Sequence, residues 1–211
     1  MTDLHQPDFT IDVAAEEVAR LLRTVRDDQL THPTPCEGYS VATLLDHLMG
    51  LCLAFTWAAA KSAVPEGGGS GSADPRPVQP SAEHLGPDWR TVLPQRLADL
   101  AKAWHEPSAW AGLTEAGGIR MPGEVAAVVT LDELVLHGWD LARATGQSFA
   151  CAPANVAAVL QFTSSMAGPG HRAAREGLFG PVVEVPDDAP DLDRALGFAG
   201  REPDWSAPRP E

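Results

Sequence analysis

A carboxylate and an imidazole in one apolar stretch constrain most strongly what this chain can fold into. Glu133 and His137 are four residues apart, so they share one face of a predicted helix that also carries Val129 and Leu141. An apolar face is buried in a folded protein, and a buried carboxylate destabilises the fold unless a positive group meets it. Another apolar helix face carries His47. We therefore predict a metal site between two helices of a bundle, with these three residues as ligands.

Each residue also has a simpler interpretation. A single histidine such as His47 on an apolar face is more often a core residue than a ligand. The pair Glu133 and His137 could be an ordinary hydrogen-bonded pair on a helix surface. If all three bind one metal, a coordination position stays open for water or substrate, which is typical of catalytic zinc. Zinc is the expected metal, although nickel, manganese and iron accept the same ligands.

The composition limits the class of protein. The chain has 211 residues, 44% hydrophobic content and a net charge of -14, which suits one acidic domain without nucleic-acid or membrane partners. No run reaches the roughly 18 apolar residues that a membrane span requires, and the first residues do not resemble a signal peptide. Cys36, Cys52 and Cys151 lack the spacing of a disulfide framework or a zinc-binding pair. We expect a soluble cytoplasmic protein.

The periodicity of the apolar residues predicts an all-α fold built on four principal helices. Ser40 is a candidate N-terminal cap and Gly146 a candidate C-terminal cap. A fifth helix and a short closing helix are expected after the bundle, with an extended segment at 179–186 between them. The predicted helices cover residues 11–28, 41–63, 90–104, 122–145, 153–166 and 191–200, and residues 107–121 are predicted as a loop.

Two segments outside the helices bear on organisation. Residues 65–80 are rich in Gly, Ser and Pro, which predicts a linker or a lid. The run at 67–72 is not a phosphate-binding loop, because no strand precedes it and no Lys-Ser/Thr follows. We predict a metal-binding bundle at 1–168 and an irregular tail at 169–211 that packs on it within the same domain.

Several residues near the predicted ligands are candidates for supporting roles. Asp46 and Asp140 could accept a hydrogen bond from a ligand histidine, although facing solvent or capping other contacts is the more ordinary expectation. Arg143 could line the pocket, but a salt bridge to an acidic neighbour is more common. Cys36 is expected to be a structural cysteine. The remaining histidines considered are expected to be solvated: His32, His84, His105 and His171.

The motifs also carry a resemblance to a known family. The run Thr34-Pro35-Cys36-Glu37-Gly38-Tyr39-Ser40-Val41 precedes His47, and Glu133 opens a second run that ends at Gly146. Together with the tail at 179–201, these runs resemble the DinB-like metalloprotein superfamily, in the branch similar to the N-terminal domain of mycothiol-dependent maleylpyruvate isomerase. The resemblance implies an up-down-down-up four-helix bundle that holds one divalent metal, usually zinc, on the residues matching His47, Glu133 and His137. It also implies mycothiol or a related thiol as co-substrate.

Two departures from the family pattern shape the functional hypothesis. Tyr39 stands where the motif usually has Trp, which keeps an aromatic wall beside the pocket. The isomerase has a C-terminal domain that supplies part of its active site, whereas this chain continues after Gly146 with a helix and a tail. The first hypothesis is therefore a metal-dependent thiol S-transferase acting on a small electrophile. The alternatives are a thiol-dependent cis/trans isomerase of the maleylpyruvate type and a non-catalytic metal- or small-molecule-binding protein, either monomeric or homodimeric. The reactive group is expected to be a metal-bound water or thiol, with no catalytic side chain identified.

Overall fold

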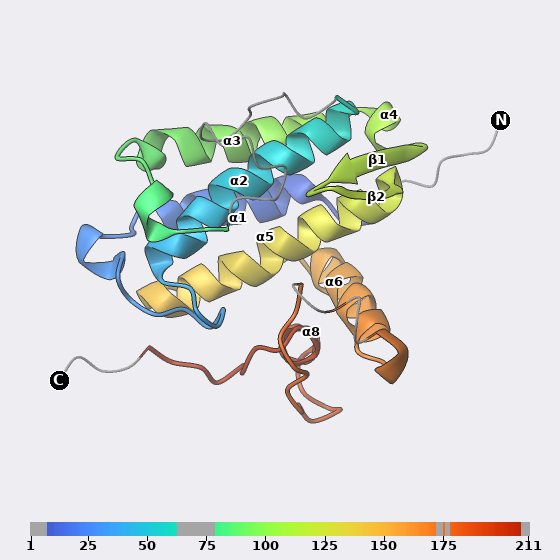
Figure 1. The fold of residues 1–211 in the computed structure, drawn as a ribbon. Helices are drawn as coiled ribbons and strands as arrows, with labels where there is room; N and C mark the ends of the chain where they lie inside the picture. The colour runs from blue at the N-terminus through green and yellow to red at the C-terminus, as the bar shows by residue number, and fades with distance from the viewer. Residues whose placement is uncertain (1–7, 63–78, 172–174, 176–177, 208–211) are drawn as a thin grey trace.

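Four long helices form the body of the protein. The computed structural model describes residues 8–62, 79–171, 175 and 178–207. In Figure 1, α1 and α5 run in one direction and α2 and α3 in the other. Helix α1 packs on α3 and α5, and α2 packs on the same two helices. This arrangement confirms the predicted up-down-down-up bundle. The four helices are α1 (Ile11–Leu22), α2 (Val41–Ala60), α3 (Trp89–Ala103) and α5 (Gly123–Thr145).

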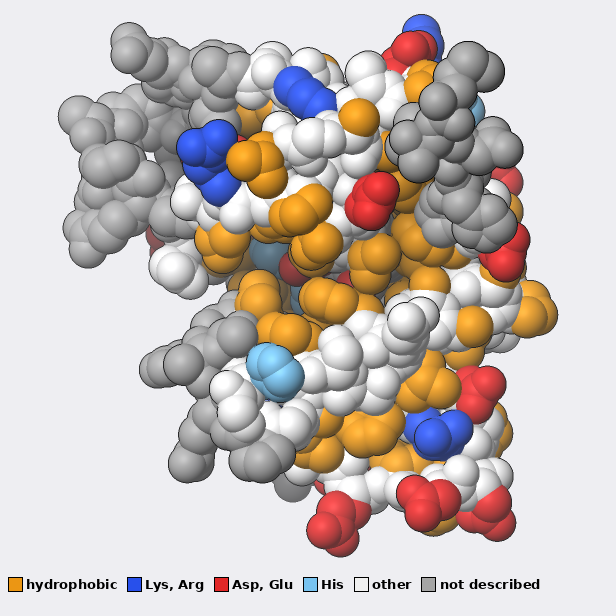
Figure 2. All heavy atoms as spheres, turned by 90° about the vertical axis from the view of Figure 1, so that its right-hand side faces the viewer, with side chains coloured by type: hydrophobic (Ala, Val, Ile, Leu, Met, Phe, Trp, Pro, Cys, Tyr) orange, Lys and Arg blue, Asp and Glu red, His pale blue; other side chains and the backbone are white. Residues whose placement is uncertain are grey.

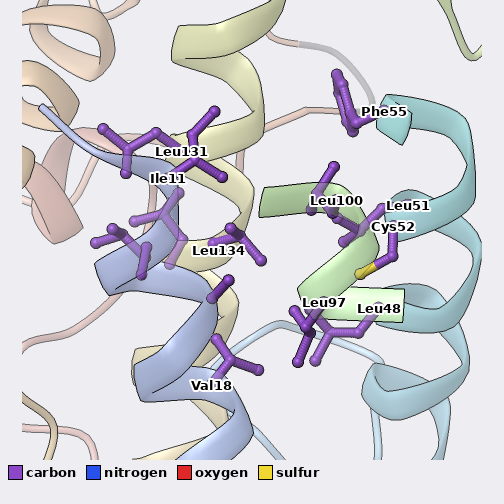
Figure 3. Close-up of a cluster of buried hydrophobic side chains, with 14 of the residues drawn as sticks. Ile11, Val18, Leu48, Leu51, Cys52, Phe55, Leu97, Leu100, Leu131 and Leu134 are labelled. Atoms are coloured by element: carbon purple, nitrogen blue, oxygen red, sulfur yellow. The ribbon is translucent and has the colours of Figure 1, made fainter. Parts of the chain in front are cut away.

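The apolar faces of these helices meet in one core, part of which Figure 3 shows. Each helix contributes a fully buried aliphatic side chain: Val18, Leu48, Leu97 and Leu131. Burying one such side chain contributes about 1.5–3 kcal/mol. The core therefore fixes how α2 and α5 lie against each other, and these are the helices that carry the predicted ligands.

Local capping signals were mostly predicted correctly. The Ser40 hydroxyl accepts a hydrogen bond from the Thr43 amide at the start of α2, and Gly146 ends α5 with a φ of 70°. Helix α2 ends earlier than predicted, because Lys61 adopts the left-handed conformation with a φ of 51°.

The predicted end of the first helix was wrong. Helix α1 stops at Leu22, and a 3-10 turn (Asp27–Gln29) occupies the residues expected to continue it. The Gln29 side chain accepts from the Arg26 amide and donates to the carbonyl of Thr145 at the end of α5. These hydrogen bonds favour a turn over a longer helix.

The segment predicted as a loop at 107–121 contains regular structure. A short helix, α4 (Pro107–Trp110), precedes an antiparallel hairpin of β1 (Leu113–Ala116) and β2 (Ile119–Pro122). Gly117 and Gly118 both have positive φ, 57° and 79°, as a two-residue hairpin turn requires. The hairpin packs on α2 and α5, and β1 and β2 are the only strands among the described residues.

The C-terminal part of the chain lies outside the four-helix layer. The predicted fifth helix is α6 (Pro153–Met166), which packs against α5 and α8 (Asp191–Phe198). The described residues also include two further 3-10 turns, at Ala82–His84 and Pro169–His171. Residues 179–186 form no strand, but Val183 donates a backbone hydrogen bond to Gly197 of α8. Figure 1 shows α6 and α8 on the α5 side of the bundle.

Two sequence expectations concern the region around α2. The prediction of a linker or lid at 65–80 falls largely on residues 63–78, which lie outside the described part of the chain. Although Asp46 and His47 interrupt its apolar run, α2 is long enough and apolar enough on average to cross a membrane. Half of its most apolar window is buried inside the bundle, as in the core helix of a soluble protein.

Candidate metal centre

The three predicted ligands converge between α2 and α5. His47 Nε2 lies 3.2 Å from Glu133 Oε2, and His137 Nε2 lies 3.1 Å from the same oxygen. The two imidazole rings have centroids 4.7 Å apart. One nitrogen or oxygen atom from each residue lies within 4.8 Å of those of the other two. The structure thus brings together residues that are far apart in the sequence.

The donor atoms fit a divalent cation. Two imidazole nitrogens and one carboxylate oxygen are ligands that zinc accepts, and Glu133 lies between the two rings with one oxygen near both. The site is partly open, because the side chains of His47 and Glu133 remain 26% and 21% exposed. Figure 2 shows a hollow on this face of the molecule, with histidine and acidic side chains at its bottom and hydrophobic side chains around it. A small molecule could therefore reach these atoms from one side.

The electrostatics of the site reflect a half-buried acid between two bases. Burial alone would raise the pKa of Glu133, but hydrogen bonds with His137 and His47 lower it below its usual range. Burial alone would lower the pKa of His137, but hydrogen bonds with Asp140 and Glu133 raise it to about 9. In the protein without a cation, positive charge on His137 therefore balances the Glu133 carboxylate.

Asp140 supports His137 from behind. Its Oδ2 lies 3.0 Å from His137 Nδ1, and its carboxylate is fully buried. Facing solvent, one of the two ordinary expectations for Asp140, was therefore wrong, and the hydrogen bond to a ligand histidine is present. The guanidinium of Arg201 contacts the same carboxylate, with Nη2 at 3.0 Å from Oδ2 and Nε at 3.4 Å from Oδ1. Burial would raise the pKa of Asp140, but the charge of Arg201 lowers it.

Sequence reasoning missed two buried residues near the site. Arg201 falls inside the tail segment that carried the family resemblance, but no local pattern connects it to Asp140. Asp132 precedes Glu133, and its Oδ1 is buried without a hydrogen-bond partner among the described residues. Burial is the main cause that raises the pKa of Asp132 well above its usual value. Its burial next to a ligand candidate was not apparent from helix periodicity.

The other candidate residues divide between the site and the surrounding structure. The edge of the Tyr39 ring faces the His47 ring, with centroids 5.8 Å apart, so this residue lies beside the site as predicted. Asp46 instead accepts a hydrogen bond from the Ser81 amide and lies 3.6 Å from His84. Arg143 donates to the carbonyl of Trp205, so the predicted salt bridge to an acidic residue was wrong.

Cys36, which was expected to be structural, lies beside the candidate metal centre. Its sulfur belongs to a cluster with one atom each of His137 and Asp140, all within 4.8 Å. Burial raises the pKa of this thiol to about 11. Cys36 is therefore a neutral thiol at physiological pH.

Comparisons with known proteins agree with this geometry. The family model described as the mycothiol maleylpyruvate isomerase N-terminal domain matches residues 11–142, more than half of the chain. The chain belongs to this family. The match to the mycothiol maleylpyruvate isomerase N-terminal domain includes all three ligand candidates and Asp140, but it ends before Arg201.

Relatives and solved structures extend the comparison beyond that domain. Two uncharacterized proteins of Mycobacterium tuberculosis, MT0763 of strain CDC 1551 / Oshkosh and Rv0738 of strain ATCC 25618 / H37Rv, are each 28% identical over 190 residues. The alignments cover 89% of this chain and 93% of each relative. Crystal structures of the mycothiol-dependent maleylpyruvate isomerase and of a His-to-Ala mutant match with a TM-score of 0.53 and 18% identity. They cover 76% of this chain and 71% of the isomerase. This structural match confirms the fold.

Proposed function

We propose that this protein is a metal-dependent enzyme that activates a low-molecular-weight thiol, mycothiol, for addition to a small electrophile. The observation that carries the proposal is the convergence of His47, Glu133 and His137, whose side chains remain 26%, 21% and 9% exposed. Membership in a family named for a mycothiol-dependent enzyme supports the choice of thiol. Zinc is the metal we propose, and nickel, manganese or iron would accept the same donors.

Each residue of the site has a defined task in this proposal. His47, Glu133 and His137 would hold the cation, and a bound cation would lower the pKa of an arriving thiol so that it reacts as a thiolate. Asp140 orients the His137 ring through its Nδ1 atom. Cys36 remains protonated, so it does not compete with the incoming thiol as a nucleophile.

Two reactions share the same first step. The thiolate sulfur forms a bond to an electrophilic carbon of the substrate, while a π bond at that carbon breaks and its electron pair moves onto the rest of the substrate. In an S-transferase the new bond persists, the electron pair on the substrate takes up the proton that the thiol released, and the product keeps the sulfur. In a cis/trans isomerase the bond breaks after rotation, and the thiol is recovered. The hydrophobic hollow suits either reaction, and the family description favours the isomerase as the second candidate.

The wider setting follows from the charge and the fold. We propose a single domain in which residues 169–211 pack as a tail on the bundle at 1–168. With a net charge of -14, we propose cytoplasmic small-molecule chemistry without nucleic-acid or membrane partners. The protein would act as a monomer or a homodimer.

Metal content and thiol binding test the proposed function together. We expect one equivalent of metal in the purified protein by elemental analysis, and saturable binding of mycothiol by calorimetry. The double variant His47→Ala/His137→Ala should lose the metal while keeping its helical circular dichroism. His105→Ala is the matched control, because His105 is exposed and contacts Asp12 rather than the site. It should keep the metal.

The outcomes separate the hypotheses. Metal at wild-type stoichiometry in the double variant would show that the ligand assignment is wrong. Metal binding without thiol binding would favour the non-catalytic alternative. Mass spectrometry of the products after turnover distinguishes the two reactions, because only the S-transferase leaves the thiol in the product.

A further inference from the structure

Arg201 belongs to the C-terminal segment, yet its side chain reaches the buried side of the candidate metal centre. Its Nη2 lies 3.0 Å from Asp140 Oδ2 and its Nε lies 3.4 Å from Asp140 Oδ1, so the guanidinium faces both oxygens. A third group, Nη1, donates to the Ala199 carbonyl at 3.0 Å. Arg201 is 6% exposed and Asp140 is fully buried. This ion pair is therefore shielded from solvent on both sides.

The same carboxylate also contacts a ligand candidate. Asp140 Oδ2 lies 3.0 Å from His137 Nδ1, and the opposite ring nitrogen, Nε2, lies 3.1 Å from Glu133 Oε2. When Nδ1 donates to Asp140, the ring can offer only Nε2 to a cation. Arg201, Asp140 and His137 thus form a continuous chain of contacts from the tail to the site.

We propose that Arg201 is a positioning residue for metal binding: it holds the Asp140 carboxylate in the orientation that makes His137 present Nε2 to the cation. This inference rests on the proposed metal site. A guanidinium that contacts both carboxylate oxygens fixes the plane of the carboxylate better than a single hydrogen bond does. Without Arg201, Asp140 would be free to rotate, and the His137 ring would lose its fixed acceptor.

A second buried arginine provides a matched control for purely structural effects. Arg175 is 8% exposed and lies in the same part of the chain, where its Nη2 donates to the carbonyls of Gly180 and Phe198. These contacts join parts of the tail to one another and do not reach the ligand candidates. Replacing Arg175 should therefore loosen the tail without changing the orientation of His137.

Zinc affinity of the full-length protein tests the proposal by competition with a chromophoric chelator. Arg201→Met should weaken zinc binding about 10–100-fold. If Arg201 acts through Asp140, the double variant Asp140→Asn/Arg201→Met should bind zinc as weakly as Asp140→Asn alone. Arg175→Met should lower the melting temperature but keep zinc affinity within about twofold of the wild type. Arg201→Lys, which retains the charge but not the planar fork, replaces Arg201→Met if that variant does not fold.

A second readout is independent of zinc. The ¹⁵N signals of the His137 ring in the metal-free protein should change in Arg201→Met and stay unchanged in Arg175→Met. Wild-type zinc affinity in Arg201→Met, equal weakening in Arg175→Met, or additive losses in the double variant would each overturn the proposal. A wild-type protein that binds no zinc would instead contradict the proposed function. In that case the ¹⁵N signals alone test the positioning role of Arg201. Unchanged His137 signals in Arg201→Met would overturn this role, and changed signals would support it.

Discussion

His137 connects the two halves of the candidate site because its two ring nitrogens have different partners. Nδ1 faces Asp140 and Nε2 faces Glu133, and both partners are carboxylates. In the protein without a cation, both nitrogens can donate only when the ring is protonated. Because these two hydrogen bonds stabilise the charged ring, they raise the pKa of His137 to about 9. A cation at Nε2 would have to displace that proton, so metal binding and protonation compete at one atom.

The raised pKa of His137 predicts how the stability of the metal-free protein depends on pH. The pKa rises from 6.5 in the unfolded chain to about 9 in the folded protein. The stabilisation is therefore fully present below pH 6.5 and is lost as the pH rises through about 9. We expect the free energy of unfolding to fall over this range by on the order of 3 kcal/mol. Chemical denaturation in the presence of a chelator measures it.

Glu133 affects a different pH range, so it does not obscure this result. Its pKa is lowered in the folded state, so its stabilisation is present above the unfolded value of 4.5 and is lost only in acid. The variant His137→Gln serves as the control and should show a much flatter dependence between pH 6.5 and 9. An equal fall in this variant would contradict the assignment to His137.

At the scale of the helices, Gly138 marks a close contact between α5 and its neighbours. A Cβ atom added at this position would lie 2.9 Å from Phe149 Cε2 and 3.2 Å from Val18 Cγ2. Val18 is fully buried, so it has little room to move. Glycine at this position therefore allows α5 to approach α1 while His137, the preceding residue, faces the site.

Two glycine substitutions test this packing in opposite directions. Gly138→Ala should lower the free energy of unfolding by about 1–3 kcal/mol through overpacking. Gly50→Ala in α2 is the matched control, because an added Cβ meets no atom within 4 Å there. It should stabilise the protein by about 0.5–1 kcal/mol, since alanine favours a helix over glycine. Denaturant unfolding of both variants measures the difference, and equal effects would contradict the packing argument.

Local signals explain which elements could be predicted from the sequence. Ser40 and Gly146 act through nearby backbone groups, so their capping roles could be inferred correctly. The end of α1 depends on a hydrogen bond from Gln29 to Thr145, which no local pattern reveals. The hairpin had a signal in Gly117 and Gly118, but its four-residue strands are too short for a clear alternation.

In the candidate site, too, local sequence patterns could identify some residues, whereas others depend on long-range contacts. Glu133 and His137 could be paired from helix periodicity, and the apolar face around His47 indicated that it points inward. Arg201 could not be paired with Asp140, because the two residues are 61 positions apart and only the packing of the tail brings them together. An arginine is the usual partner for a buried carboxylate, so the chemistry of the pair was predictable. The sequence could not show which arginine the packing of the tail would bring to Asp140.

At the scale of the whole molecule, α2 has two possible environments. Its length and apolar composition would allow it to cross a membrane, yet half of its most apolar window is buried in the bundle. The helix also carries His47, which faces Glu133, and Asp46, which binds the Ser81 amide. In a bilayer these two polar side chains would lose their partners and lie in hydrocarbon, which is strongly unfavourable.

We therefore expect the protein to behave as a soluble bundle rather than as a membrane protein. Cells expressing it should release it into the soluble fraction without detergent, and the purified protein should not float with lipid vesicles. The net charge of -14 repels the protein from anionic lipids. We therefore expect no flotation with vesicles that contain anionic lipid, as with vesicles that lack it. Protein unfolded in urea and diluted onto vesicles is the control, because it exposes the apolar face of α2. Recovery of the native protein only in detergent would contradict the assignment of α2 to the bundle core.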